Sequence, residues 1–260
     1  MVPALYSSIL LLGTVLLSGA LAETGNSSPF SVLTGFQHRL SGISTFQATV
    51  ERRQTYRNVH RNASGVLLYD RTIGTRYEWK NPGHYLFISM DTLVWGVDIN
   101  KRCGWKSATP DNRLRRQTDP LGRLLRLQSV PPEEFSFRGN NDSLLFFSLA
   151  LGRRTYCTIG IEPGSKRCRI IEYFAEKGIL LEKTFFSFQN GRDSGVLPDA
   201  VIISGLYGAD VAVDTIIITR RHVNATVGKK EFAFPAGITW GKNGATGCLS
   251  QKQFHPAAGR

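Results

Sequence analysis

The sequence predicts a mainly β fold with short helices (an α+β fold), and three observations lead to this prediction. Stretches in which apolar and polar residues alternate recur about every ten residues, with turns containing Gly or Pro between them. One amphipathic stretch near the N-terminus has the spacing of a helix instead. An Arg- and Pro-rich segment interrupts the strand pattern between residues 106 and 140. These features indicate an antiparallel sheet, barrel or sandwich.

The first expected element is a helix that begins at Ser28-Pro29, because Pro is favoured at the first helical position. Gly42 is expected near its end. Apolar residues recur along this segment every three or four positions, which gives one apolar stripe: Phe30, Leu33, Phe36, Leu40 and Ile43.

A first strand is predicted at 45–56, where Phe46, Ala48 and Val50 share one face. In the predicted strand at 75–80, Tyr77 and Trp79 are two residues apart, so both rings are expected on one side of the sheet. The other predicted strands are 64–70, 84–89, 93–99, 143–150, 154–161, 167–175, 178–188, 199–206 and 211–221, with a last short strand in 229–234.

The interruption at 106–140 is expected to contain a short helix of its own. In TDPLGRLLRL, Asp119 can cap the helix and Pro120 can take its first position. Leu121, Leu124 and Leu125 then point inward. A loop of this length is more often functional than not.

Residues 1–22 have the features of a secretory signal peptide. An apolar core at 9–17 is too short to span a bilayer, and Ala20-Leu21-Ala22 is a cleavage site. We therefore expect cleavage after Ala22 and export. Because the mature chain has no internal repeat and no sharp linker, 23–240 is expected to form one domain, followed by a flexible C-terminal tail at 241–260.

The formal net charge is +12, and much of it lies in the first half of the chain. Residues 51–130 contain 15 Lys and Arg against 7 Asp and Glu. A basic exported protein suits anionic lipid head groups, polyanionic envelope polymers or an acidic partner. Nucleic acid is not expected as a partner after export, and no recognition motif supports it.

The four cysteines, Cys103, Cys157, Cys168 and Cys248, suggest disulfides in an exported chain, with three possible pairings. Cys157 and Cys168 flank the turn at 162–165 and share strand parity, so we expect them to bridge a hairpin. That pairing would leave Cys103 with Cys248. A metal site is not expected, because the sequence has no C-x-x-C and no nearby His.

Motifs of catalysis are missing from the sequence. It contains no G-x-S-x-G, H-E-x-x-H, P-loop or dinucleotide-binding fingerprint, and its five histidines lack metal-ligand spacing. We therefore expect no enzyme activity, no cofactor and no metal. The alternative in the enzyme class is an exported hydrolase, whose nucleophile and base would have to converge in the fold.

Several stretches together resemble the LolA/LolB family of periplasmic lipoprotein carriers. The N-terminal helix leads into ISTFQATVERRQ and then SGVLLYDRTIGTRYEW, in which Gly65 opens a strand, Arg71 stands at the family's arginine and Tyr77 falls at an aromatic position. Near the end, EFAFPAGITW resembles the family's closing strand through Phe232 and Phe234.

This resemblance implies an open, strongly curved antiparallel half-barrel with an N-terminal helix and a helical lid. Apolar side chains on its concave side would hold the acyl chains of a lipoprotein. In the family the arginine matched by Arg71 bonds backbone groups of the lid and holds it closed, so Arg71 is the expected lid latch. The residues expected to bind lipid are Phe46, Leu67, Tyr69, Tyr77, Trp79, Trp95, Leu121, Leu124 and Leu125.

The function implied is that of a monomeric periplasmic carrier that transfers lipoproteins towards the outer membrane. Its expected partners are lipoprotein acyl chains or another lipid, an inner-membrane releasing complex and an outer-membrane acceptor. Arg115, Arg116, Arg123 and Arg126, next to the lid leucines, are expected to meet phosphate head groups or a membrane partner. Two alternatives stay open: a general lipid or glycolipid carrier, and an RseB-like regulatory protein of envelope stress.

Overall fold

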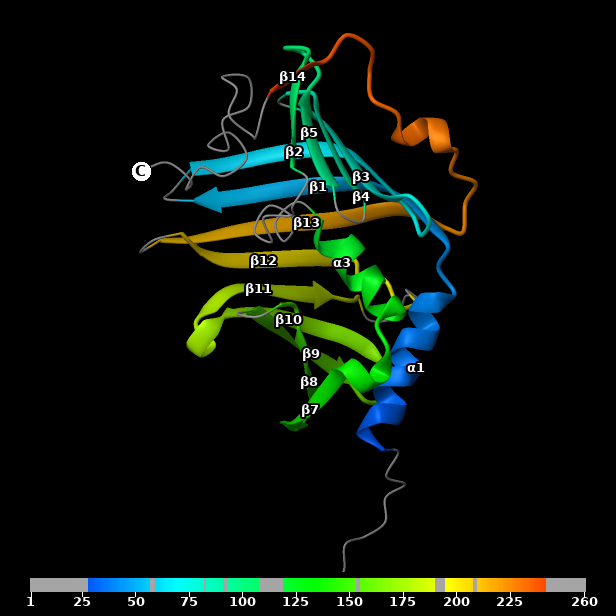
Figure 1. Cartoon of the computed structure of the whole chain (residues 1–260), viewed down its shortest axis with the longest axis vertical. Coiled ribbons are helices and arrows are strands. Elements are labelled where there is room, and N and C mark those ends of the chain that lie inside the picture. The colour runs from blue at the N-terminus through cyan, green and yellow to red at the C-terminus, as the bar shows by residue number, and fades with distance from the viewer. Residues whose placement is uncertain are drawn as a thin grey trace, which may run out of the picture.

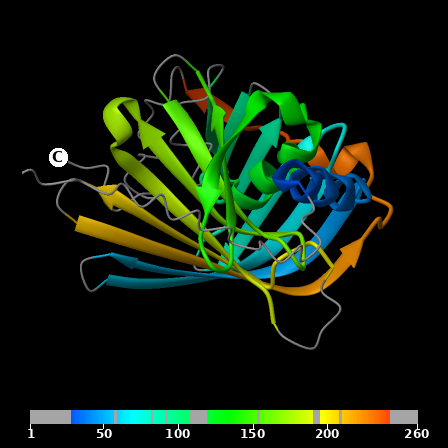
Figure 2. The ribbon, with the colours of Figure 1, turned by 90° about the horizontal axis from the view of Figure 1, so that it is seen from below.

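The protein is built on one large curved sheet. The computed structural model describes residues 28–56, 59–81, 83–90, 93–107, 119–152, 155–189, 195–207 and 210–241. Within these residues the sheet has fourteen strands, in the order β14-β6-β5-β4-β3-β2-β1-β13-β12-β11-β10-β9-β8-β7. It curls around α1 and α3, which lie on its inner side (Figures 1 and 2). The predicted mainly β, open half-barrel is therefore confirmed.

The helical elements are short. They are α1 (Pro29–Ser41), α3 (Pro120–Arg126) and the 3₁₀ turns η1 (Leu127–Ser129), η2 (Pro132–Glu134), η3 (Glu176–Gly178) and η4 (Lys229–Phe232). The strands are β1 (Thr45–Tyr56), β2 (Val59–Asp70), β3 (Gly74–Asn81), β4 (Tyr85–Met90), β5 (Leu93–Asp98), β6 (Cys103–Ser107), β7 (Phe135–Asn140), β8 (Leu145–Ala150), β9 (Thr155–Glu162), β10 (Arg167–Ala175), β11 (Leu180–Ser187), β12 (Ala200–Tyr207), β13 (Asp210–Val223) and β14 (Thr239–Gly241).

The sheet consists of two antiparallel meanders, β1 to β6 and β7 to β13, and of β14, which pairs with β6 at one edge. The two meanders join where β13 returns to pair with β1, with Val50 opposite Ile218. Strand β1 therefore lies in the middle of the sheet, and both meanders belong to one continuous sheet. The expected signal peptide and all but the first residue of the expected tail lie outside the described residues. No helix within the described ranges is long and apolar enough to cross a membrane.

Both predicted helices form, for the reasons that predicted them. Helix α1 begins at Pro29 and buries Leu33, Phe36 and Leu40, each 0% exposed. In α3, Asp119 is the N-cap and accepts a hydrogen bond from the Gly122 N–H at 2.9 Å. Such a cap satisfies a backbone donor that has no partner inside the helix.

The segment at 106–140, which interrupts the predicted strand pattern, contains strand residues that were not predicted. It includes the end of β6 and all of β7, which pairs with β8 at the sheet edge. Phe135 and Phe137 share the inner face there, opposite Leu149 and Phe147. Arg138 and Gly139 obscured this alternation in the sequence, and a bulge between Phe137 and Gly139 breaks its register.

The C-terminal segment corrects another prediction. Residues 229–232 form the turn η4 instead of a strand, and the last strand is β14, which runs parallel to β6. Phe232 is buried against the outer face of the sheet together with Leu68 and Ile88. Burial of this ring and the hydrogen bond from Arg76 to the Glu231 carbonyl hold η4 on the outer face. The segment crosses the outer side of β2 to β6 before β14 pairs with β6 (Figure 1).

Candidate functional site

The inner, concave face of the sheet is apolar over most of its width. Strand register brings one side chain from each strand into a common row, for example Phe147, Ile159 and Ile171 on β8, β9 and β10. The buried side chains of this face include Phe46, Val50, Leu67, Tyr77, Trp79, Phe87, Phe147, Ile159, Ile171, Phe186, Val201 and Ile216. A broad apolar surface therefore faces the helices.

Helices α1 and α3, not a second sheet, cover this face. Leu121, Leu124 and Leu125 of α3 are at most 1% exposed and belong to the same buried cluster as the strand residues. Each such leucine stabilises the covered state by about 1.5–3 kcal/mol relative to exposure to water. The protein is thus in a closed arrangement, in which the helices occupy the apolar face.

Most of the residues expected to bind lipid gather here. Those in the concave cluster are Phe46, Leu67, Tyr69, Tyr77, Trp79, Leu121, Leu124 and Leu125. The expected arrangement of Tyr77 and Trp79 is confirmed, since β3 and β4 pair antiparallel and both rings lie on the concave face, stacked at 5.9 Å between centroids.

The prediction that Trp95 lies on the concave face was wrong. Tyr77 pairs with Phe87, which pairs with Gly96, so Trp95 lies on the opposite, convex face. There its ring packs on Phe234 at 5.5 Å. The parity of one strand relative to its neighbours depends on register, which the sequence of the strand alone does not give.

Trp105 of β6 takes the place that Trp95 was expected to fill. It is 5% exposed and lies opposite Gly96 in the concave cluster. A Cβ atom on Gly96 would lie 2.6 Å from the Trp105 indole, so the glycine makes room for the ring. This residue was missed because β6 was not recognised as a strand.

A buried ion pair joins α3 to the sheet. Arg123 of α3 donates to the Glu182 carboxylate of β11 at 3.0 Å, and the two side chains are 10% and 4% exposed. The guanidinium also lies over the Tyr173 ring at 4.7 Å. Burial lowers the pKa of Arg123, but Tyr173 and Glu182 outweigh it, so the pKa is raised. Burial also raises the pKa of Tyr173 to about 12.

These contacts correct the expectation for the arginines near the lid. Arg123 is buried against the Glu182 carboxylate, so it does not face outward to meet phosphates. Arg126 binds the Asp119 carboxylate with 30% of its own side chain exposed. Arg115 and Arg116 lie outside the described residues.

Arg71 also differs from its prediction. It is exposed, in the turn after β2. Its guanidinium donates to the carbonyls of Ser41 and Ile43, the latter at 2.7 Å, at the end of α1. The expected acceptors in 106–140 are therefore replaced by acceptors beside α1, because the chain leaves β2 next to the helix end.

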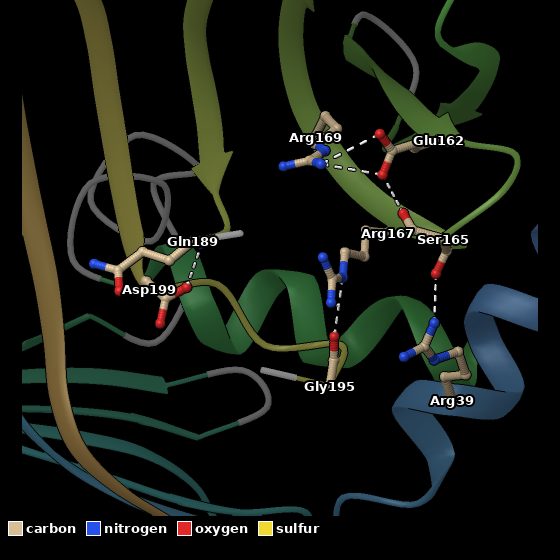
Figure 3. A network of polar contacts seen from close by, with 8 residues as sticks. All are labelled: Arg39, Glu162, Ser165, Arg167, Arg169, Gln189, Gly195 and Asp199. Carbon is tan, nitrogen blue, oxygen red and sulfur yellow. Dashed lines mark hydrogen bonds and ion pairs between the residues drawn. The ribbon is translucent and has the colours of Figure 1, made fainter. Parts of the chain in front are cut away.

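Polar side chains of α1 attach the helix to two other parts of the protein. Gln37 donates to the carbonyls of Leu127 and Val130, at 2.9 and 2.7 Å, which ties α1 to the segment after α3. Arg39 donates to the carbonyl of Ser165 in the β9–β10 turn, and Figure 3 shows this contact extending through Glu162 to Arg169.

The predicted disulfide between Cys157 and Cys168 was wrong, because both are thiols. Cys157 lies opposite Tyr173, and Cys168 lies opposite Ile161, four residues further along β9. Four strand residues span about 13 Å, whereas a disulfide needs Cα atoms within about 7 Å. Cys103 is disulfide-bonded, and Cys248, its expected partner, lies outside the described residues.

Comparison with solved structures shows which fold this is. No protein-family model matches the sequence, and no curated protein matches it significantly. A LolA superfamily protein of Nitrosomonas europaea is similar in structure, with a TM-score of 0.59 and 13% identity, over 80% of this chain and 99% of that one. A putative outer membrane lipoprotein-sorting protein domain of Vibrio parahaemolyticus gives 0.56 and 12%, over 78% and 95%.

A third solved structure, a DUF1329 family protein of Desulfovibrio piger, gives a TM-score of 0.59 and 10% identity, over 80% of this chain and 98% of that one. At such low identity the likeness establishes the fold and not the activity. This chain covers almost the whole length of each of the three structures. The chain therefore has the LolA-like fold.

Proposed function

We propose that this chain is a periplasmic carrier that binds the acyl chains of lipoproteins and transfers them towards the outer membrane. The observation that carries the proposal is the broad apolar concave face, covered in the closed state by α1 and α3. A carrier must replace the bilayer around acyl chains, worth about 0.8 kcal/mol for each buried CH₂ group. Displacing the helices would offer such a surface without unfolding the sheet.

The rest of the proposal concerns the compartment and the partners. Cleavage after Ala22 would release a mature carrier domain at 23–240 with a tail at 241–260. Its partners would be an inner-membrane complex that loads it and an outer-membrane acceptor that unloads it. The proposed role is binding and transfer, and it assigns no catalytic residue.

The tryptophans allow a direct test, because they lie on different faces. Trp79 and Trp105 are on the concave face, while Trp95 and Trp240 contact Phe234 on the convex side. We expect a lipopeptide with brominated acyl chains to quench the fluorescence of a variant that keeps only Trp79. The matched variant that keeps only Trp95 should not be quenched. Absence of saturable binding, or equal quenching of both variants, would overturn the proposal.

Arg71 provides a prediction about transfer. Its guanidinium holds the end of α1 through two carbonyls, and we propose that this contact favours closure of the empty carrier. Arg71→Leu should weaken closure by about 1 kcal/mol, which corresponds to roughly fivefold tighter retention of cargo. The measurement is the rate at which a fluorescent lipopeptide passes from the loaded protein to acceptor liposomes.

Two controls separate a latch from a surface charge. Arg53→Leu removes an exposed arginine on β1, 63% exposed, and should leave transfer unchanged. Arg71→Lys keeps the charge but not the planar guanidinium, whose Nη2 donates to both carbonyls, so it should restore transfer only in part. Unchanged transfer by Arg71→Leu would show that Arg71 has no latch role.

A further inference from the structure

Three hydroxyl groups form a polar spot within the apolar concave face. Thr75 of β3 lies directly opposite Ser89 of β4, and Tyr77 is the next residue of β3 on the same face. Their side chains are 1%, 4% and 2% exposed. Leu67 lies across from Tyr77 and Val94 across from Ser89. Tyr69 of β2 lies opposite Thr75, and its hydroxyl accepts a hydrogen bond from Gln128 at 3.3 Å. The three hydroxyls are thus gathered at one place on a surface that is otherwise mostly apolar.

In the closed protein these hydroxyl groups lack good hydrogen-bond partners among the described residues. The hydroxyl oxygens of Thr75 and Ser89 have no hydrogen-bond partner among the described residues. The Tyr77 hydroxyl lies against the backbone of Leu121 in α3, and burial raises the pKa of Tyr77 well above its usual value. A buried hydroxyl without a partner costs free energy that Val or Ala of similar shape would avoid. The closed state therefore does not explain why these hydroxyls are present.

Helix α3 sits directly over the spot. A Cβ atom on Gly122 would lie 2.3 Å from the Thr75 hydroxyl oxygen, so the glycine backbone contacts the strand side chain here. If α3 moves away to admit cargo, all three hydroxyls face the bound molecule. They then become hydrogen-bond donors at a fixed place on a surface that otherwise contacts hydrocarbon.

The charges around the spot favour a neutral acceptor. Arg123 and Arg126, the cations of α3, pair with Glu182 and Asp119, so they do not supply charge for a phosphate. An ester carbonyl accepts hydrogen bonds, carries no net charge and is attached directly to an acyl chain. It is the polar group that must lie beside hydrocarbon when an acylated molecule is buried.

We propose that Thr75, Tyr77 and Ser89 bind the ester carbonyls through which acyl chains are linked to the glyceryl group of the cargo. This inference rests on the proposed carrier function and fixes the orientation of the cargo. The chains extend over the apolar face, and the linkage lies at β3 and β4.

The test compares two ligands that differ only in the carbonyls: a lipopeptide with ester-linked chains and its ether-linked analogue of equal chain length. The native protein should bind the diester about tenfold more tightly. The variant T75V/Y77F/S89A keeps the side-chain shapes, so it should bind the diether like the native protein and lose the preference for the diester. The control S148A removes a buried hydroxyl of β8 that binds Arg138, and should keep the preference.

The outcomes separate this inference from the proposed function. Binding of neither ligand would contradict the carrier itself, whereas equal binding of both by the native protein would overturn only the carbonyl site. The empty triple variant should melt no lower than the native protein, and a lower melting temperature would also overturn the inference. A free diacylglycerol, measured in parallel, tells whether the esters of a lipoprotein or of a membrane lipid are preferred.

Discussion

Replacing Glu182 with Leu is expected to lower the free energy of unfolding by about 3–5 kcal/mol, because it leaves the Arg123 guanidinium buried without its counter-charge. The pair is well shielded, with the two side chains 10% and 4% exposed. Arg123 also contacts Tyr173, but a ring face does not replace a carboxylate at 3.0 Å. Chemical denaturation of the empty protein measures the effect.

The double variant Arg123→Met, Glu182→Leu should recover most of this loss. It removes both charges and replaces the two side chains by apolar side chains of similar volume. Glu51→Leu is the matched control on the surface, since Glu51 pairs with Arg53 at 3.6 Å with both side chains more than half exposed. It should change stability by less than about 0.5 kcal/mol. A Glu182→Leu variant as stable as this control would show that the pair does not hold α3 to the sheet.

Gly122→Val is expected to push α3 off the concave face. A Cβ atom there would lie 2.3 Å from both carboxylate oxygens of Asp119 and from the Thr75 hydroxyl. Asp119 cannot turn aside cheaply, because it caps α3 and binds Arg126. Overpacking of this kind costs about 1–3 kcal/mol, and part of it is relieved if the helix lifts.

The expected readouts follow from that movement. The empty variant should bind an apolar dye that the native protein binds weakly, and the amides of α3 should exchange with solvent faster. Gly164→Val is the control, since no atom lies within 4 Å of a Cβ added in that turn. A crystal structure of Gly122→Val with α3 unmoved would contradict the prediction.

Local patterns in the sequence predicted most of the individual elements, but not β6, β7 or η4. Helix α3 formed with Asp119 as its cap and Pro120 at its first position, and the first strand has the predicted bounds, Thr45–Tyr56. Alternation placed Tyr77 and Trp79 on one face. These features depend on neighbours within a few residues, so backbone geometry and side-chain period determine them.

The sequence by itself therefore determined the mainly β class, the two helices and the apolar faces of the strands that carry Phe46 and Leu67. The tertiary structure alone decided which face Trp95 occupies, that Cys157 and Cys168 stand apart, and that Arg71 reaches the end of α1. It also brought Arg123 to Glu182, 59 residues along the chain. The physical reason is that register and long-range contact follow from how the strands pair and how the sheet curves, and no local period encodes either.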